Sequence, residues 1–511
     1  MSAAPPAPVQ SGRILPAQAG LRADVVVVGT GAGGAMAARE LARRGLDVIA
    51  LEEGGYRTPR DFNQREDEML ALLFAERGAR ATADLAIHVL QGRGVGGSTV
   101  HNTNLCKRMP DAILEQWALE GGSPRELAPL YQATERDLDV APMDWQALNP
   151  NNDRFRVGVS KLGYRGGFLA HNRRNCVGSG FCELGCSFNA KQNALKLLVP
   201  QAAAAGARIF SDVRAERITT AAGRASGVEA TVLSPDGRPA GRLQVTARAV
   251  VLGASATGSA ALVLRSGLPD PHQRAGRNLH LHPGVALAGV FDDEITGWKG
   301  IPQSYECTEF LDFSPGSGRR VWILPAFAHP IGLASALPGF GADHMRSMRL
   351  YRRIAVVAAM VHDETAGRVS LDDAGRMRLE YRLGEPDAAQ LAVGLREGAR
   401  ILLAAGARRV LVPYLRPLEI TSEAKLDQID ERGAHPHDIP MTAVHPMSTL
   451  PMGHDPAASV VDARGQHHQV RGLWVCDGSL FPTSIGVPPQ ISIYTFARRS
   501  AGFVADSLGT G

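Results

Sequence analysis

The sequence predicts an α/β protein with two parts: a discontinuous Rossmann-like, nucleotide-binding domain, and a second domain built on an antiparallel sheet covered by helices. Two observations predict this class. Near the N-terminus, an apolar strand, a glycine-rich turn, a helix and a second strand form a β-α-β unit, which requires a parallel sheet. Between residues 291 and 434, short alternating strands precede one long helix, a pattern typical of an antiparallel sheet with a helical cover.

The β-α-β unit begins with a buried-strand pattern, Asp-Val-Val-Val-Val-Gly, at 24–29. The next residues predict a helix over 33–44, because apolar side chains fall on one face and charged ones on the other. Gly45 is a natural stop for that helix. A second apolar strand over 46–51 ends at Glu52, which completes the unit.

Other strand patterns lie far along the chain. Apolar runs at 249–253 and 473–476 indicate that the nucleotide domain also takes pieces from the middle and the end of the sequence. In the second domain the expected strands are 321–324, 352–361, 368–371 and 377–381, followed by a helix over 387–404.

These patterns divide the chain into four regions. Residues 1–21, which begin with a stretch rich in Pro and Ala, are expected to be a disordered leader. The predicted domains are a nucleotide domain of 22–110, 190–290 and 435–511, a cap or loop region of 111–189, and a substrate domain of 291–434.

Composition excludes several classes of protein. The 511 residues are 44% hydrophobic and 21% charged, as in an ordinary globular protein, and the net charge is only +4. Lys and Arg do not cluster among aromatic residues, so no nucleic-acid partner is expected. No run approaches the roughly 18 apolar residues of a membrane span. The N-terminus lacks the apolar core of a secretory signal, so we expect a cytoplasmic protein.

The glycine-rich turn predicts a dinucleotide site. Gly29 permits the tight turn, Gly31 lets a pyrophosphate approach the backbone, and Gly34 lets the helix pack on the strand. The helix N-terminus offers unpaired N–H groups to the phosphates. Glu52, at the end of the second strand, is placed to accept hydrogen bonds from a ribose diol.

Three more segments follow in order along the chain. A second glycine-rich loop at 92–98 contains Gly96, Gly97 and Ser98. The segments His-Pro-Met-Ser-Thr-Leu-Pro-Met-Gly at 445–453 and Asp-Gly-Ser-Leu-Phe-Pro at 477–482 come near the C-terminus. With the N-terminal fingerprint, these motifs resemble the glucose–methanol–choline (GMC) oxidoreductases, which use FAD. The resemblance spans most of the chain and is greatest to long-chain fatty-alcohol oxidases, with cholesterol-oxidase-like members similar at the C-terminal motif.

The resemblance implies an FAD-dependent oxidation of an alcohol to an aldehyde or ketone. His445 occupies the position of the family's base, which takes the hydroxyl proton while hydride passes to the flavin N5; a near-neutral imidazole suits this role. The apolar segment 322–327 and the fatty-alcohol oxidases suggest an apolar or long-chain alcohol. Oxygen, a quinone or a redox protein would accept the electrons. Further cofactor-binding residues are expected at Val213, Asp477, Gln490 and Ile491.

The chain departs from the family at Pro488, where an Asn or His usually assists the base. Proline has neither a side-chain donor nor a backbone N–H. Either His445 works without that partner or another residue replaces it: Gln490 is the nearest amide, and His282, His435 and His437 are more remote. Alternatively, the chemistry has shifted to that of a flavoprotein lyase or isomerase. A non-catalytic FAD-binding protein is a third class.

His101 and Asn102 raise a separate question about cofactor attachment. Gly96 and Gly97 followed by His101-Asn102 match the pattern Gly-Gly-x-x-x-His-Asn of choline-oxidase-like members, whose histidine is bonded to the flavin 8α-methyl group. The resemblance therefore implies a covalent flavin at His101. The alternative is a histidine that packs non-covalently against the flavin ring.

Three of the six cysteines, Cys176, Cys182 and Cys186, have the spacing C-x5-C-x3-C. Thiolates are soft ligands suited to iron–sulfur clusters or zinc, although the lack of a nearby fourth cysteine disfavours structural zinc. The spacing resembles that of bacterial FAD glucose dehydrogenases, whose three cysteines hold a three-iron cluster, and also a segment of the fatty-alcohol oxidases. We interpret them as thiols packing a loop over the flavin, with an iron–sulfur cluster or another metal as the alternatives.

Overall fold

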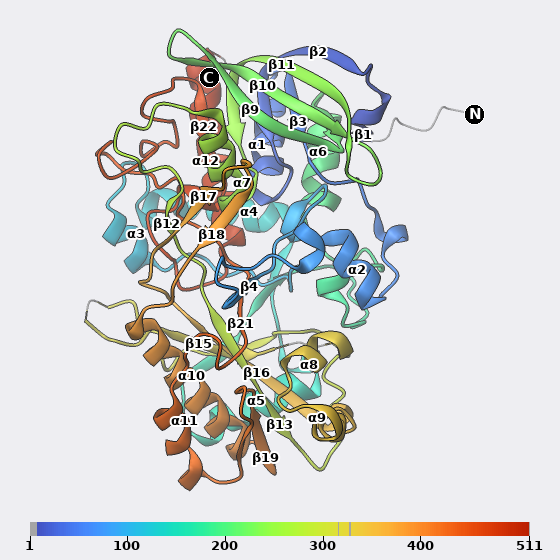
Figure 1. Cartoon of the computed structure of the whole chain (residues 1–511), viewed down its shortest axis with the longest axis vertical. Coiled ribbons are helices and arrows are strands. Elements are labelled where there is room, and N and C mark those ends of the chain that lie inside the picture. The colour runs from blue at the N-terminus through green and yellow to red at the C-terminus, as the bar shows by residue number, and fades with distance from the viewer. Residues whose placement is uncertain (1–7, 315, 327–328, 510–511) are drawn as a thin grey trace.

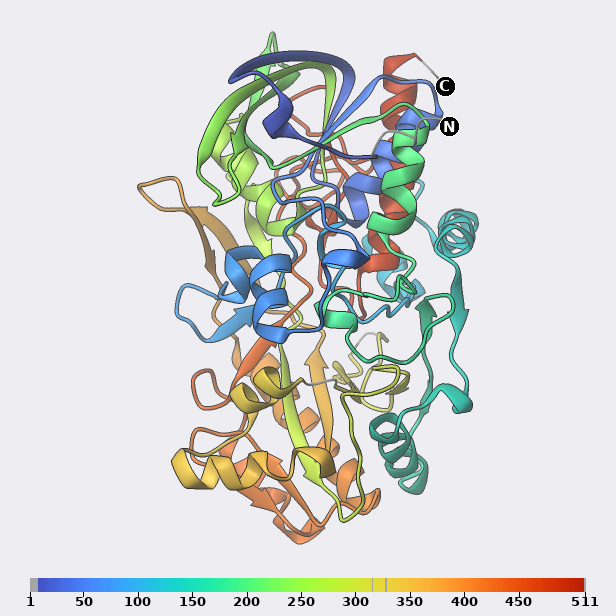
Figure 2. The ribbon, with the colours of Figure 1, turned by 90° about the vertical axis from the view of Figure 1, so that its right-hand side faces the viewer.

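The chain forms two lobes, stacked along its long axis in a computed structural model that describes residues 8–314, 316–326 and 329–509 (Figure 1). One sheet dominates each lobe. The first and last described elements, β1 and α12, both lie in the upper lobe (Figures 1 and 2). Strands of the two main sheets alternate along the sequence, so the chain crosses repeatedly between the lobes. The predicted class, a discontinuous Rossmann-like domain with an antiparallel-sheet domain covered by helices, is confirmed.

The upper sheet has a parallel centre and an antiparallel edge. β2 pairs in parallel with β3 and with β11, while β9, β10 and β11 run antiparallel. The sheet order is β1 (Gln10–Ser11), β8 (Arg208–Ser211), β3 (Val48–Leu51), β2 (Gln18–Val28), β11 (Pro239–Leu252), β10 (Arg224–Leu233) and β9 (Val213–Ala221), with β22 (Leu473–Val475) paired to β11.

Small residues let the helices of this lobe pack closely. The first, α1 (Ala32–Arg43), buries alanines, glycines and Leu41 between the sheet and the C-terminal helix α12 (Gln490–Leu508). Arg39 is fully buried within this packing, where it is paired with Asp137 at 2.7 Å. The other helices of this lobe are α4 (Pro124–Asp137), α6 (Val199–Ala204) and α7 (Ser255–Ser266).

The lower sheet takes strands from well outside 291–434. Its central pair, β13 and β16, is antiparallel, and the long helix α10 (Glu385–Ala404) packs on it. The sheet order is β20 (Leu418–Ile420), β19 (Arg409–Val412), β13 (Gly284–Val290), β16 (Ile354–Val361), β15 (Val321–Pro325), β14 (Tyr305–Cys307) and β6 (Gly166–Phe168); β21 (Met441–Ala443) joins β13 to β4 (Ile87–Val89).

The remaining elements are short. Strands β12 (Arg277–Leu279), β17 (Gly367–Leu371) and β18 (Met377–Glu380) form a separate small sheet, so the predicted strands 368–371 and 377–381 do not join the main one. The others are α2 (Glu66–Leu73), α3 (Asp111–Trp117), α5 (Pro150–Lys161), α8 (Pro330–Ala336), α9 (Gly341–Met348), α11 (Asp427–Arg432), β5 (Val140–Pro142) and β7 (Ala170–Asn172).

The expected disordered leader is wrong for residues 8–21. They form β1, a short 3-10 helix (Gly12–Ile14) and the start of β2, because β1 finds a parallel partner in β8. Residues 1–7 lie outside the described residues. The other predicted domain boundaries stay predictions. Within the described ranges, no helix is both long and apolar enough to traverse a bilayer.

Candidate active site

The turn after β2 shows why its glycines are needed. A Cβ at Gly29 would lie 2.4 Å from the carbonyl oxygen of Gly253, and one at Gly34 would lie 2.0 Å from that of Gly29. These contacts hold the turn and α1 tightly against the sheet. Around Gly31 the nearest atom to an added Cβ is 3.9 Å away, in Gly97. Space therefore remains where a pyrophosphate would approach the backbone.

The C-terminal motif meets the same helix N-terminus. A Cβ at Gly33 would lie 1.8 Å from the carbonyl oxygen of Cys476, so this close approach requires glycine. The next residue, Asp477, is buried and accepts hydrogen bonds from Ser259 Oγ at 2.5 Å and from the N–H of Ser479 at 2.9 Å. Burial raises the pKa of Asp477 above its usual value.

Glu52 closes the turn from the end of β3. Its Oε2 accepts from the N–H of Thr30 at 3.0 Å and from Thr30 Oγ1 at 2.9 Å, while Oε1 accepts from the N–H of Gly54 at 3.0 Å. Burial raises the pKa of this carboxyl group. Val213 lies beside it and donates its N–H to the carbonyl oxygen of Glu52 at 2.8 Å. The acid is thus rigidly placed where a ribose diol is expected.

The second glycine loop packs against the first. The N–H of Gly96 donates to Thr30 Oγ1 at 3.3 Å, and Gly97 lies against Gly31. Ser98 accepts the N–H of Gly92 at 2.9 Å, which holds the loop in shape. The structure therefore brings together two segments that the sequence separates by more than sixty residues.

His101 follows this loop and carries a buried imidazole. Its side chain is almost fully buried, and Nε2 has no hydrogen-bond partner among the described residues. The ring lies against Phe74, with centroids 4.0 Å apart, and Gly92 leaves room for it, since a Cβ there would lie 2.7 Å from Nε2. Burial, assisted by the charge of Lys191, lowers the pKa of His101 to about 3.

Asn102 joins this loop to the C-terminal helix. Its Nδ2 donates to Oε1 of Gln490 at 2.8 Å, and the Gln490 amide donates in turn to the carbonyl oxygen of Leu105. Gln490 begins α12, and Ile491 behind it is buried. Both ends of the Gln490 amide are therefore hydrogen-bonded to the segment 92–105, which we call the flavin loop.

His445 reaches the same region through strand pairing. It follows β21, which runs parallel to β4 with Ala443 opposite Val89. Paired parallel strands end at the same edge of a sheet. The residues that follow β21 and β4, which are His445 and the loop at 92–98, therefore start next to each other. The segment 445–453 also contacts the motif at 477–482, because the N–H of Ser448 donates to the carbonyl oxygen of Gly478 at 2.9 Å.

His282 is the residue that meets His445. Their Nδ1 atoms lie 3.3 Å apart, and the N–H of Gly486 donates to Nε2 of His282 at 2.8 Å. Burial lowers the pKa of His445 to about 3, so the half-buried imidazole is neutral near pH 7. His435 and His437 are exposed, and neither has a hydrogen bond or ring contact with His445 within the part of the chain that the structure describes.

Asp363 lies beside this histidine pair and belongs to none of the sequence motifs. Its carboxylate accepts from the N–H of Leu281 at 2.9 Å and from Tyr381 Oη at 2.8 Å. The N–H of His282, whose backbone is left-handed with φ of +52°, also donates to this carboxylate at 3.4 Å. Burial would raise the pKa of Asp363, but His280 and the backbone N–H of Leu281 outweigh it and lower the pKa. The alternating pattern His280, His282 was the available signal.

The apolar segment 322–327 belongs mostly to the core. Trp322, Ile323 and Leu324 lie in β15, whose residues are all buried within the sheet. Residue 327 lies outside the described residues. The segment therefore carries no argument about the substrate.

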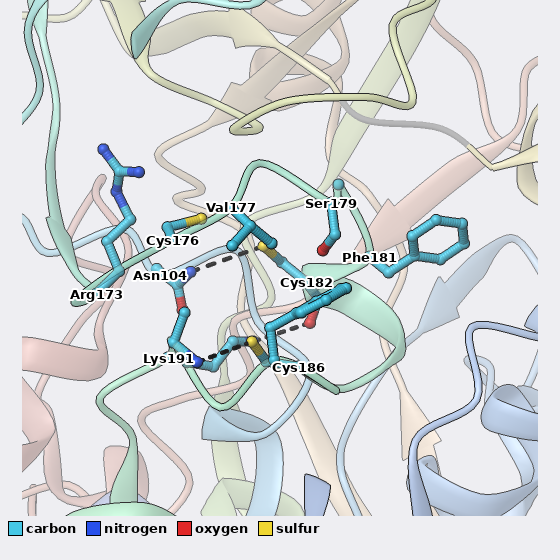
Figure 3. Close-up of a pocket in the computed structure, with 12 residues that line it drawn as sticks. Asn104, Arg173, Cys176, Val177, Ser179, Phe181, Cys182, Cys186 and Lys191 are labelled. Atoms are coloured by element: carbon cyan, nitrogen blue, oxygen red, sulfur yellow. Dashed lines mark hydrogen bonds between the residues drawn. The ribbon is translucent and has the colours of Figure 1, made fainter. Parts of the chain in front are cut away.

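The three clustered cysteines line one pocket (Figure 3). Each sulfur accepts an N–H: Cys176 from Gly178 at 3.4 Å, Cys186 from Ala190 at 3.3 Å, and Cys182 from Asn104 Nδ2 at 3.8 Å. Burial raises the pKa of Cys182 to about 12. In the described ranges, no group of three or more His, Cys, Asp or Glu is arranged to hold a metal ion.

Two glycine loops and a buried acid at the edge of a Rossmann-like sheet, together with a buried histidine pair, are typical of a dinucleotide-dependent oxidoreductase. Comparison with protein families refines this class. The GMC oxidoreductase models match residues 70–284 and 363–497, and an FAD binding domain model matches 24–59. The chain belongs to the GMC oxidoreductase family and is an FAD-binding oxidoreductase.

Relatives extend over almost the whole chain. An uncharacterized GMC-type oxidoreductase of Mycobacterium tuberculosis is 39% identical over 94% of this chain and 75% of its own length. A long-chain-alcohol oxidase of Arabidopsis thaliana is 29% identical over 96% of this chain and 68% of its own. Among solved structures, pyridoxine 4-oxidase from Mesorbium loti has a TM-score of 0.70 at 20% identity, covering 94% of this chain and 98% of that one. The structural likeness at this identity shows the fold alone.

Proposed function

We propose that this protein uses FAD to oxidise an apolar or long-chain alcohol to an aldehyde or ketone. The observation that carries the proposal is the neutral His445, held by His282 at the edge where the flavin loop begins. The long-chain-alcohol oxidases among the relatives support the substrate class. Oxygen is the acceptor we propose first, with a quinone as the alternative.

The residues of the turn fit FAD. Gly31 leaves space for the pyrophosphate, Glu52 and Asp477 offer buried carboxylates, and His101 presents a buried nitrogen without a partner. When bound, FAD supplies the acceptor for the hydride that leaves the alcohol carbon. His445 takes the hydroxyl proton, for which a neutral imidazole is required. Its contact with His282 orients the ring, the role that the family's Asn would have had at the position of Pro488.

We further propose that His101 Nε2 is bonded to the flavin 8α-methyl carbon, in place of one C–H bond. The proton would pass to solvent, and the two electrons would reduce the flavin, which oxygen would then reoxidise. A buried, neutral nitrogen with a free lone pair is suited to such a bond, and the match to Gly-Gly-x-x-x-His-Asn supports it. Acid precipitation of the holoprotein tests the bond: yellow colour stays with the pellet if it exists. Release of all flavin to the supernatant contradicts it, and His101→Ala is the matched control.

A second candidate is a dehydrogenase that passes electrons through an iron–sulfur cluster at Cys176, Cys182 and Cys186 to a redox protein. Sulfurs that accept N–H groups around one pocket favour it. The residues as arranged do not form a metal-ion site, so we derive no electron path through them. Assay of iron and acid-labile sulfide in the purified protein decides between this candidate and plain thiols.

Substrate-dependent bleaching under anaerobic conditions tests the main proposal. We expect 1-dodecanol to bleach the visible flavin band, and we expect His445→Gln to slow bleaching by about 10²-fold or more, the usual contribution of a general base. His437→Gln, an exposed histidine, is the control and should bleach normally. If no alcohol bleaches the flavin, the proposal fails and a lyase or isomerase becomes the better reading.

A further inference from the structure

Lys191 is a buried cation at the back of the flavin loop, and the proposed reaction gives it no role. Only 2% of the residue is exposed. Its Nζ donates to three backbone carbonyl oxygens: that of Val100 at 2.9 Å, that of Asn102, and that of Cys182 at 2.9 Å. An ammonium has three donors, so all of them are used.

The three carbonyl acceptors belong to two different loops. Val100 and Asn102 are the neighbours of His101 on either side, so Lys191 fixes the backbone that carries the imidazole. Cys182 is one of the pocket thiols, and Lys191 lies among the residues that line that pocket (Figure 3). One side chain thus ties the flavin loop to the cysteine loop.

The anchor itself is well held. Lys191 forms an antiparallel bridge with Arg173, and the N–H of Gln192 donates to the carbonyl oxygen of Asn172 at 3.0 Å. No carboxylate lies within ion-pair distance of Lys191 in the described ranges, so the three carbonyl oxygens are its direct partners. Burial lowers the pKa of Lys191 to about 8, although the nearby Glu183 acts in the opposite direction. Burying an ammonium in this way is costly, and removing any acceptor leaves a charged donor unsatisfied. The three contacts are therefore expected to move together.

We propose that Lys191 is a positioning residue that couples the cysteine pocket to the His101–Asn102 segment. A chemical change at the pocket thiols that displaces the carbonyl of Cys182 would shift Lys191 and, through it, the segment that faces the flavin. The coupling rests on the FAD site described above, and it makes the pocket a place where a thiol reagent alters the flavin environment from a distance. Coupling of two sites is reciprocal, so it is measurable from either side.

Alkylation of the wild-type holoprotein is the first test. Iodoacetamide is added after treatment with an iron chelator, peptide mapping reports the labelling of Cys176, Cys182 and Cys186, and visible circular dichroism reports the flavin. We expect the flavin signal to change in step with labelling of the pocket. Complete labelling with an unchanged flavin signal would overturn the proposal. This test uses no substituted protein, so it does not depend on a variant that folds.

The second test compares Lys191→Met with Lys196→Met. Lys196 is a near neighbour whose Nζ donates to the carbonyl oxygen of Asn189 and, among the described residues, to no acceptor in the pocket. It lies near Cys186 but, in the described ranges, its Nζ does not hydrogen-bond the His101 segment, so it is the control for removal of a nearby charge. We expect Lys191→Met to raise pocket labelling at least tenfold and to abolish the response of the flavin signal to labelling. In the His101→Ala background, where no bond can hold the flavin, we expect the same change to speed the loss of flavin on gel filtration at least tenfold. A change in flavin binding alone, a change in pocket labelling alone, or the same changes in Lys196→Met would refute coupling.

Failure of this proposal and failure of the proposed reaction are distinguishable. Substrate bleaching depends on His445 and is measured without alkylation. If no alcohol bleaches the flavin of the wild-type protein, alcohol oxidation is contradicted, while the alkylation test of coupling still applies.

Discussion

Asn102 and Gln490, 388 positions apart, are joined by a hydrogen bond of 2.8 Å from Nδ2 to Oε1. The bond ties the loop that carries His101 to the first turn of the C-terminal helix. It also answers the question raised by Pro488. Gln490 was the nearest amide in the sequence, but its side chain is engaged with Asn102 and Leu105, and the structure places His282 against His445.

Replacing Gln490 by Leu should loosen the cofactor more than it slows the chemistry. The change leaves the half-buried amide of Asn102 and the carbonyl of Leu105 without their partner, which costs about 1–3 kcal/mol in total. In the His101→Ala background, where no bond can hold the cofactor, we expect FAD to dissociate about tenfold more readily in equilibrium dialysis, with kcat at saturating FAD reduced much less. Gln244→Leu, at an exposed position of β11, is the control. Equal loss in both variants would contradict a specific role.

Replacing His282 by Leu should disturb the base without removing it. His445 keeps its ring but loses the contact that orients it, so we expect kcat to fall about 10- to 100-fold while KM stays within about threefold. The visible flavin spectrum should be unchanged. His437→Leu, which is exposed, should leave both constants as they are. A fall in flavin content instead of kcat would assign His282 to the fold.

The glycines of the first turn should separate stability from cofactor binding. Gly31→Ala meets no atom closer than 3.9 Å, so the unfolding midpoint without added FAD should change by about 2 °C or less, while FAD binding, measured in the His101→Ala background, weakens at least tenfold. Gly34→Ala, with 2.0 Å to the carbonyl of Gly29, should prevent folding or lower the midpoint strongly. Gly20→Ala, in open space, is the control for both measurements.

Acid should destabilise the protein below about pH 6.5, the usual pKa of an unfolded histidine. Burial lowers the pKa of His171 and His445 to about 3 and that of His467 to about 4. Between those values and about 6.5 the unfolded chain binds protons that the folded chain does not, so stability falls as pH falls. Glu183, whose pKa burial raises to about 7, acts in the opposite direction, as do Glu52 and Asp477, but fewer carboxyl groups than histidines are shifted in this way by burial.

Scanning calorimetry at pH 7 and pH 4.5 measures this balance. We expect the Tm to be lower at pH 4.5 by several degrees, and the urea midpoint to fall in parallel. Replacing His171, which has no part in the proposed reaction, by Asn should reduce the difference. An unchanged or higher Tm at pH 4.5 would show that the carboxyl groups dominate the proton balance.

The short-range features were readable in the sequence because they depend on chain geometry within a few residues. The strand, turn and helix from Val25 to Arg43, the glycine positions and the acid at Glu52 all follow from local patterns. The order of the GMC motifs likewise indicated FAD and His445. In contrast, the leader was assigned to disorder because a two-strand edge contact such as that of β1 with β8 leaves little trace in composition.

The tertiary structure decided which distant groups meet. His282 pairs with His445, Asp363 accepts the N–H of His282, and Lys191 joins Asn102 to Cys182. Each contact spans dozens of residues or more, except that between Lys191 and Cys182, and depends on how separate strands and loops pack. A local pattern sets the conformation of its own segment, whereas the partner of a buried polar group is set by the burial of the whole core.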